Sequence, residues 1–118
     1  MSISAAQQHF NDAEGFEKNG LLQEAIASYK KAIEADATFV SAYYNLALAY
    51  HQTQQPVQAI VNLKKVTELD PGDASAFNNL GVLCVAMNKL DDAKRCFEKA
   101  LSIDGDYQDA RDNLEKTL

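Results

Sequence analysis

Apolar side chains recur every three or four positions along most of the chain, the spacing that places residues on one face of an α-helix. Residues 75–88 illustrate the pattern, with apolar positions at Phe77, Leu80, Leu83, Cys84 and Met87. Short polar stretches that contain Pro, Gly, Asn or Asp interrupt the pattern at intervals and are typical of turns. The chain is therefore predicted to be all-α, with helices joined by short turns.

The pattern repeats with a period of 34 residues. The recurring positions are small residues, large apolar residues and closing aspartates: Ala25, Ala59, Ala93; Tyr29, Leu63, Phe97; Asp36, Asp70, Asp104. Each unit is predicted to be a pair of antiparallel helices, because small residues let two backbones approach while large ones fill the adjacent space. The predicted boundaries are 6–39, 40–73 and 74–107, followed by one further helix over 108–118.

Residues at the turns predict where helices begin and end. Gly20 and Asn88 are expected in the left-handed conformation that ends a helix. Pro56 suits the first turn of a helix, and Asp73 and Asp106 are expected as N-caps.

Length, composition and charge narrow the class of protein. The chain has 118 residues, of which 47% are hydrophobic and 24% charged, and these values favour one domain, 1–118. A net charge of −6 disfavours nucleic acid and anionic membranes as partners. No apolar run is long enough for a membrane span, and the start, MSISAAQQHF, lacks the pattern of a signal peptide. The two cysteines form no disulfide framework, so a cytoplasmic location is expected.

Period, helix pairing and anchor residues together resemble the tetratricopeptide repeat (TPR) family. The second unit carries the pattern as Tyr43, Leu46, Ala47, Tyr50, Ala59, Leu63, Val66 and Pro71. The third carries it as Phe77, Leu80, Gly81, Cys84, Ala93, Phe97 and Ala100. The first departs from it at His9 and Asp12, where large apolar residues are usual. The resemblance implies three repeats stacked as a right-handed superhelix, a C-terminal solvating helix, and a non-enzymatic role in protein–protein interaction.

Polar residues on the outermost helices bear on how many repeats the stack contains. Asp12, Arg111 and Glu115 stand where inner repeats have apolar or small residues. Terminal repeats need such a polar outer face. Three repeats and a capping helix are therefore expected, rather than a slice of a longer array.

Four of the eight asparagines share one register: Asn11, Asn45, Asn79 and Asn113 are 34 residues apart. At 100° per residue, Asn79 lies about 200° from Phe77, almost opposite the predicted core face. By the TPR resemblance, the first helix of each pair lines a concave groove, where these amides would form a ladder. The groove resembles that of the asparagine-ladder TPR superhelix of O-GlcNAc transferase, which holds an extended peptide by its main chain. A carboxamide can pair with a peptide N–H and C=O together.

Specificity for particular peptides would then come from side chains beside the ladder: Phe10, Tyr44, Leu48, Asn78 and Val82. A simpler alternative remains open for the asparagines, which keep an exposed face polar or bond to the preceding turn without any ligand. A similar alternative remains for Leu48 and Val82, since isolated exposed apolar residues are common in proteins that bind nothing there.

TPR domains that clamp the acidic tails of heat-shock chaperones use Lys, Asn and Arg on the same inner helices. The corresponding positions in this chain are Phe10, Glu14, Asn45, Ser75 and Asn79. No cation is available there to neutralise a terminal carboxylate. That class of ligand is not expected.

No other pattern predicts an enzyme, a metal site or a cofactor. His9 and His51 lack partners at metal-ligand spacing, and Cys84 and Cys96 fall within apolar helical patterns. The lysines on the second helices, Lys30, Lys31, Lys64, Lys65 and Lys99, are expected to face solvent, with docking of an acidic partner as the alternative. The predicted function is binding of a protein or peptide partner. The alternatives are a self-associating scaffold and a targeting domain of a larger enzyme.

Overall fold

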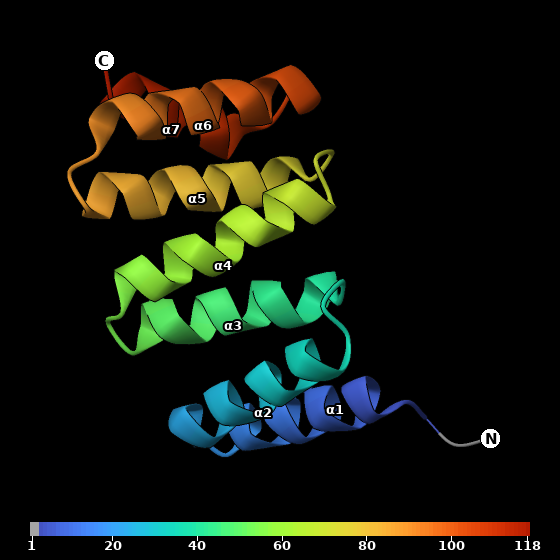
Figure 1. The fold of residues 1–118 in the computed structure, drawn as a ribbon. Coiled ribbons are helices and arrows are strands. Elements are labelled where there is room, and N and C mark those ends of the chain that lie inside the picture. Colours follow the sequence, from blue (N-terminus) through green and yellow to red (C-terminus); the bar gives the residue numbers. More distant parts are fainter. Residues whose placement is uncertain (1–2) are drawn as a thin grey trace. The chain divides into compact units, whose positions relative to one another are not determined.

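A computed structural model describes residues 3–118, and within this range the chain is all-α, with seven helices and no strand (Figure 1). The helices are α1 (Ala5–Lys18), α2 (Leu22–Ala35), α3 (Val40–Gln52), α4 (Pro56–Leu69), α5 (Ala74–Ala86), α6 (Leu90–Ile103) and α7 (Gln108–Lys116). Three helix pairs and a C-terminal helix were expected from the period of 34, and this prediction is confirmed. No helix in the described range is long and apolar enough to cross a membrane.

The chain divides into two compact units, and the division falls within the sequence of α4: the first unit ends at Asn62 and the second begins at Leu63. In the first unit α1 packs against α2, and α2 also contacts α3. The close approach of these helices relies on Ala13 and Ala25, which are completely buried together with Tyr29. Phe10 closes this core, because its ring stacks on Phe39 with centroids 5.0 Å apart and meets Tyr29 edge-on at 5.6 Å.

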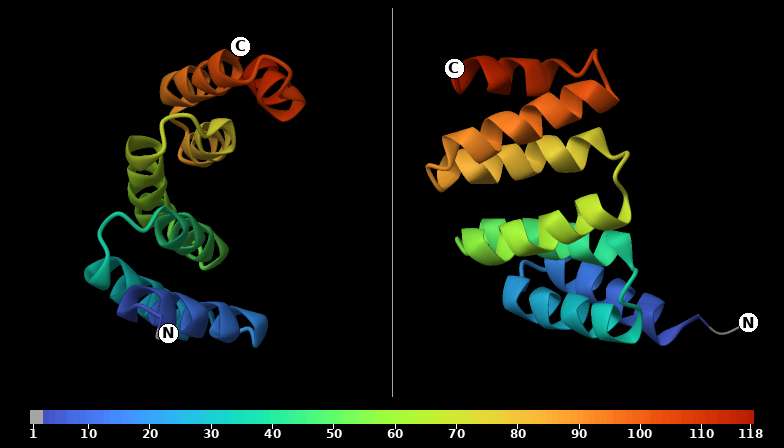
Figure 2. Two further views of the ribbon diagram at one scale, coloured as in Figure 1. Left: turned by 90° about the vertical axis from the view of Figure 1, so that its right-hand side faces the viewer. Right: turned by 45° about the horizontal axis from the view of Figure 1, so that its top comes forward.

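In the second unit α5 and α6 run antiparallel side by side, and α7 packs mainly against α6 (Figure 2). The α5–α6 contact centres on Gly81 and Phe97. A Cβ atom on Gly81 would lie only 2.5 Å from the Phe97 ring, so no residue larger than glycine fits there without movement. Phe97 is 1% exposed and is the largest fully buried side chain of the second unit.

The turn inside each predicted repeat has the same main-chain form. Gly20, Gln54 and Asn88 have φ angles of 75°, 60° and 57°, the left-handed region. One residue later, an N–H reaches back over the turn to a helix carbonyl, as from Lys89 to Cys84 at 2.8 Å. The left-handed conformations of Gly20 and Asn88 are thus confirmed, and Gln54 adopts the same conformation without prediction.

Two of the three predicted helix starts are confirmed, and one is wrong. Helix α4 begins at Pro56, and the Asp73 carboxylate caps α5 by accepting a hydrogen bond from the Ala76 N–H at 3.1 Å. The prediction for Asp106 was wrong, because the N-cap of α7 is Tyr107. The Asp106 N–H instead donates to the Asp104 carboxylate at 3.1 Å, so this tight turn delays the helix by one residue.

Candidate functional site

The asparagine register places one carboxamide on each of α1, α3, α5 and α7. In the first unit Asn11 is exposed and Asn45 is half-buried; in the second unit Asn79 and Asn113 are half-buried. Asn11 accepts a hydrogen bond at Oδ1 from Gln7 Nε2 on the preceding turn, at 2.9 Å. All four residues therefore keep part of their surface accessible.

Asn45 belongs to a polar bridge that links α1, α2 and α3. Its Nδ2 donates to the Tyr29 hydroxyl at 3.3 Å, and the Glu17 carboxylate of α1 acts on the same hydroxyl. Burial raises the pKa of Tyr29 well above its usual range, and the nearby Glu17 carboxylate raises it further, whereas the bond from Asn45 lowers it. The bridge orients the Asn45 amide and uses one of its two N–H donors.

We expect the Tyr29 hydroxyl to make the free energy of unfolding decrease as the pH becomes alkaline. Its pKa is higher in the folded chain than the value near 10 of an unfolded tyrosine, so the stabilisation is complete below about pH 10 and decreases as pH rises further. Tyr29→Phe should cost about 1 kcal/mol at neutral pH, because one hydrogen-bond partner is removed. Urea unfolding between about pH 9 and 11 should then show a shallower loss of stability in the variant. Equal slopes would contradict this role for Tyr29.

Asn113 is oriented differently from Asn45. Its Nδ2 donates to Oδ1 of Asn78 at 3.0 Å, and this bond joins α7 to α5. Asn78 is only 6% exposed, so its carbonyl serves as a buried acceptor within the second unit. Its expected role in selecting a peptide stays a prediction, and the bond to Asn113 shows how it would act, by setting the orientation of a register amide.

The other predicted contact residues differ in exposure. Leu48 on α3 and Val82 on α5 are each 41% exposed. Phe10 and Tyr44 are half-buried, and Phe10 contributes part of its ring to the first core. The side chains of Leu48 and Val82 are therefore more accessible to a ligand than those of Phe10 and Tyr44.

A hollow that the sequence did not predict adjoins Val82 and Asn113 in the second unit. It has a volume of about 130 Å³ between α5, α6 and α7. Its lining residues are mainly apolar: Val82, Val85, Leu90, Phe97, Asn113, Lys116 and Thr117. Val85 and Leu90 are 43% and 44% exposed, so the hollow opens to solvent beside a register amide. A comparison of the units at a spacing of 68 would have pointed to it, since Glu17 and Tyr29 become Val85 and Phe97.

Both thiols belong to the second unit, where Cys84 is buried and Cys96 is half-buried, and neither forms a disulfide. Burial raises the pKa of Cys84, and it raises the pKa of Cys96 to about 11. A thiol with so high a pKa is rarely a thiolate at neutral pH, which disfavours nucleophilic chemistry. Within residues 3–118, no cluster of three His, Cys, Asp or Glu side chains could hold a metal ion.

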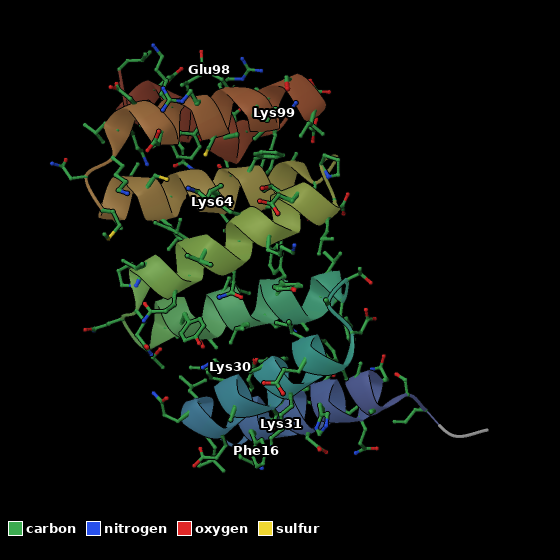
Figure 3. The ribbon with its side chains drawn as sticks, in the orientation of Figure 1. Phe16, Lys30, Lys31, Lys64, Glu98 and Lys99 are labelled. Atoms are coloured by element: carbon green, nitrogen blue, oxygen red, sulfur yellow. The ribbon has the colours of Figure 1, made fainter. Side chains whose placement is uncertain are left out.

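Figure 3 labels four of the five lysines of the second helices. Lys30, Lys31, Lys64 and Lys99 are exposed, and Lys65 pairs with Glu68 at 3.8 Å. Lys99 also reaches over the Phe77 ring, with Nζ 6.0 Å from the centroid. These contacts are typical of a solvated helix face, where single ion pairs contribute little stability.

Models of known families match three segments of the chain. The TPR repeat model matches residues 17–54, and the tetratricopeptide repeat model matches residues 40–73 and 74–107. The last two segments coincide with the predicted second and third repeats. The chain belongs to the tetratricopeptide repeat family. A search of curated proteins found no match to the sequence.

Solved structures resemble nearly the whole chain. The first TPR of Spaghetti (RPAP3), bound to the HSP90 peptide SRMEEVD, is 25% identical, with a TM-score of 0.86; the match covers 96% of this chain and 90% of that one. The second TPR domain of human RPAP3, in complex with the HSP70 peptide SGPTIEEVD, is 28% identical with the same TM-score, over 96% and 94% of the two chains. MamA is 26% identical, with a TM-score of 0.89, over 97% of this chain and 67% of its own.

These similarities confirm the predicted fold of three TPR helix pairs and a C-terminal helix. They also support the predicted role, because TPR domains are in general non-catalytic modules for protein interaction. Two of these similar structures contain a peptide of HSP90 or HSP70. Helices α3 and α5, with sequences VSAYYNLALAYHQ and ASAFNNLGVLCVA, contain neither Lys nor Arg.

Proposed function

We propose that this TPR chain binds an extended peptide on the faces that carry the register asparagines, Asn11 and Asn45 in the first unit and Asn79 and Asn113 in the second. The observation that carries the proposal is a carboxamide at one register position of α1, α3, α5 and α7, each with accessible surface. Two similar TPR domains bound to peptides support a peptide as the ligand.

The register amides would pair with the peptide main chain. Each carboxamide has two N–H donors and one acceptor, which complement the C=O and N–H of a peptide group. The bonds from Asn45 to Tyr29 and from Asn113 to Asn78 hold two of these amides in fixed orientations. An amide that is already oriented loses less side-chain freedom on binding, which favours affinity. The resemblance to the asparagine ladder of O-GlcNAc transferase supports the same role.

Side chains beside the register would select among peptides. Leu48 and Val82 offer exposed apolar contacts, and Phe10 and Tyr44 offer aromatic edges. The absence of Lys and Arg from α3 and α5 removes the cations that would clamp a terminal carboxylate. We therefore propose recognition of an internal segment of a partner protein rather than of its C-terminus.

Selection of random linear peptides displayed on phage, followed by calorimetric titration of the enriched sequences as C-terminal amides, tests the proposal. We expect Asn79→Ala and Asn113→Ala each to weaken binding about three- to tenfold, the range for one hydrogen bond. Asn62→Ala is a matched control, since Asn62 lies on α4 outside the register and donates only to the Gln58 carbonyl at 2.8 Å. It should bind like the parent.

Thermal unfolding separates a binding role from a structural one. If Asn79→Ala and Asn113→Ala lower the melting temperature while every selected peptide binds them as tightly as the parent, the asparagines serve the fold alone. The proposal also fails if no enriched peptide binds in solution.

A further inference from the structure

The hollow in the second unit occupies the position at which the first unit has its polar bridge. Val82, Val85 and Phe97 stand 68 residues after Glu14, Glu17 and Tyr29. Two carboxylates and a hydroxyl are thus replaced by two valines and a phenyl ring. Phe97 cannot bond to the amide of Asn113 as Tyr29 bonds to that of Asn45, so Asn113 bonds to Asn78 instead. The second unit is left with an open apolar hollow beside a register amide.

We propose that this hollow receives one branched aliphatic side chain of the bound peptide, from a residue followed by an acidic one; the inference rests on the function proposed above. A volume of about 130 Å³ is roughly four times the 30 Å³ share of one water molecule, enough for the four carbons of a leucine side chain. Val82, Val85, Leu90 and Phe97 would surround that side chain with apolar atoms.

The charged residue that lines the hollow indicates which type of residue follows the aliphatic one in the peptide. Lys116 is the one charged side chain among the lining residues. The ion pairs found within residues 3–118 join Lys65 to Glu68 and Arg95 to Asp92, so Lys116 has no carboxylate partner in this range. A carboxylate one residue along the peptide would supply that partner. The amide of Asn113, which also lines the hollow, would meet the main chain between the two residues.

A blocked dipeptide tests the hollow without a full ligand. Ac-Leu-Asp-NH₂ should shift the backbone amide signals of Val82, Val85, Leu90 and Asn113 in a ¹H–¹⁵N correlation titration of the whole chain. Ac-Ala-Asp-NH₂ should bind about tenfold more weakly, because it buries less apolar surface. Ac-Leu-Asn-NH₂ should lose severalfold in affinity because it cannot pair with Lys116.

Val85→Glu places in the hollow the carboxylate that Glu17 provides in the first unit. Because Val85 is 43% exposed, the variant should fold, and dipeptide affinity should decrease at least tenfold. Val61→Glu is the matched control. Val61 is an exposed valine on α4, 61% accessible, and does not line the hollow. Its dipeptide affinity should equal that of the parent.

The outcomes separate this inference from the proposed function. If selected peptides respond to Asn79→Ala but bind Val85→Glu as tightly as the parent, the hollow is not a subsite and the peptide proposal stands. If the dipeptide shifts no amide around the hollow, the inference is overturned. If no long peptide binds while the dipeptide titrates the hollow and Val85→Glu abolishes the shifts, the apolar site is real and the asparagine proposal is wrong.

Discussion

Phe97→Ala should lower the free energy of unfolding by about 3–5 kcal/mol, the usual range for deleting a buried aromatic ring. Phe97 is 1% exposed and packs against Gly81 across the α5–α6 contact, so truncation leaves a cavity in the centre of the second unit. In a repeat protein such a loss acts mainly on the affected repeat and its neighbours. Urea unfolding would measure the total loss, and hydrogen exchange should show reduced protection in α5–α7 before α1 and α2 respond.

Val85→Ala provides the comparison for that experiment. Val85 lines the same hollow as Phe97 but is 43% exposed, so its truncation should change stability by no more than about 0.5 kcal/mol. If Phe97→Ala cost less than about 1 kcal/mol, Phe97 could not be the centre of the second core.

Gly81→Leu should be the second most damaging substitution. A Cβ at Gly81 would lie 2.5 Å from the Phe97 ring, and the remaining leucine carbons would need further space. Overpacking of this kind costs about 1–3 kcal/mol, occasionally more, and the roughly 1 kcal/mol gained by removing a glycine from a helix offsets only part of it. Because the clash is severe, we expect a net loss of about 1–2 kcal/mol, measured by urea unfolding.

A double-mutant cycle identifies the cause of the Gly81 effect. In the Phe97→Ala background the ring is absent, so Gly81→Leu should become neutral or stabilising. Gly15→Leu on α1 is the matched control, since nothing lies within 4 Å of a Cβ there. It should stabilise the chain by up to about 1 kcal/mol. A loss at Gly81 that is the same with and without the Phe97 ring would show that the clash does not cause it.

The helices and their pairing could be predicted because the signals are local. The spacing of apolar residues defines each helix, and small residues recurring every 34 positions, such as Ala25, Ala59 and Ala93, indicate where two helices touch. The tight turns were harder to predict from the sequence. The left-handed Gln54 was missed because glutamine has no preference for that conformation, and Asp106 was misassigned because its N–H bonds to Asp104 rather than opening a helix.

The candidate site could be predicted only in part. The register of Asn45 and Asn113 follows from counting, but their bonds to Tyr29 and Asn78 depend on where side chains from other helices point. The hollow beside Val85 depends on three helices meeting at one place, which no single stretch of sequence encodes.

The turn inside each helix pair has a consequence for how such repeats diverge. Gly20, Gln54 and Asn88 share one main-chain conformation, although only glycine adopts it at no steric cost. The hydrogen bond that closes the helix end forms in all three turns, whichever of the three residue types stands at this position. This position is therefore free to drift through several amino acids while the hairpin keeps its shape. A search that demanded glycine there would overlook two of the three repeats of this chain.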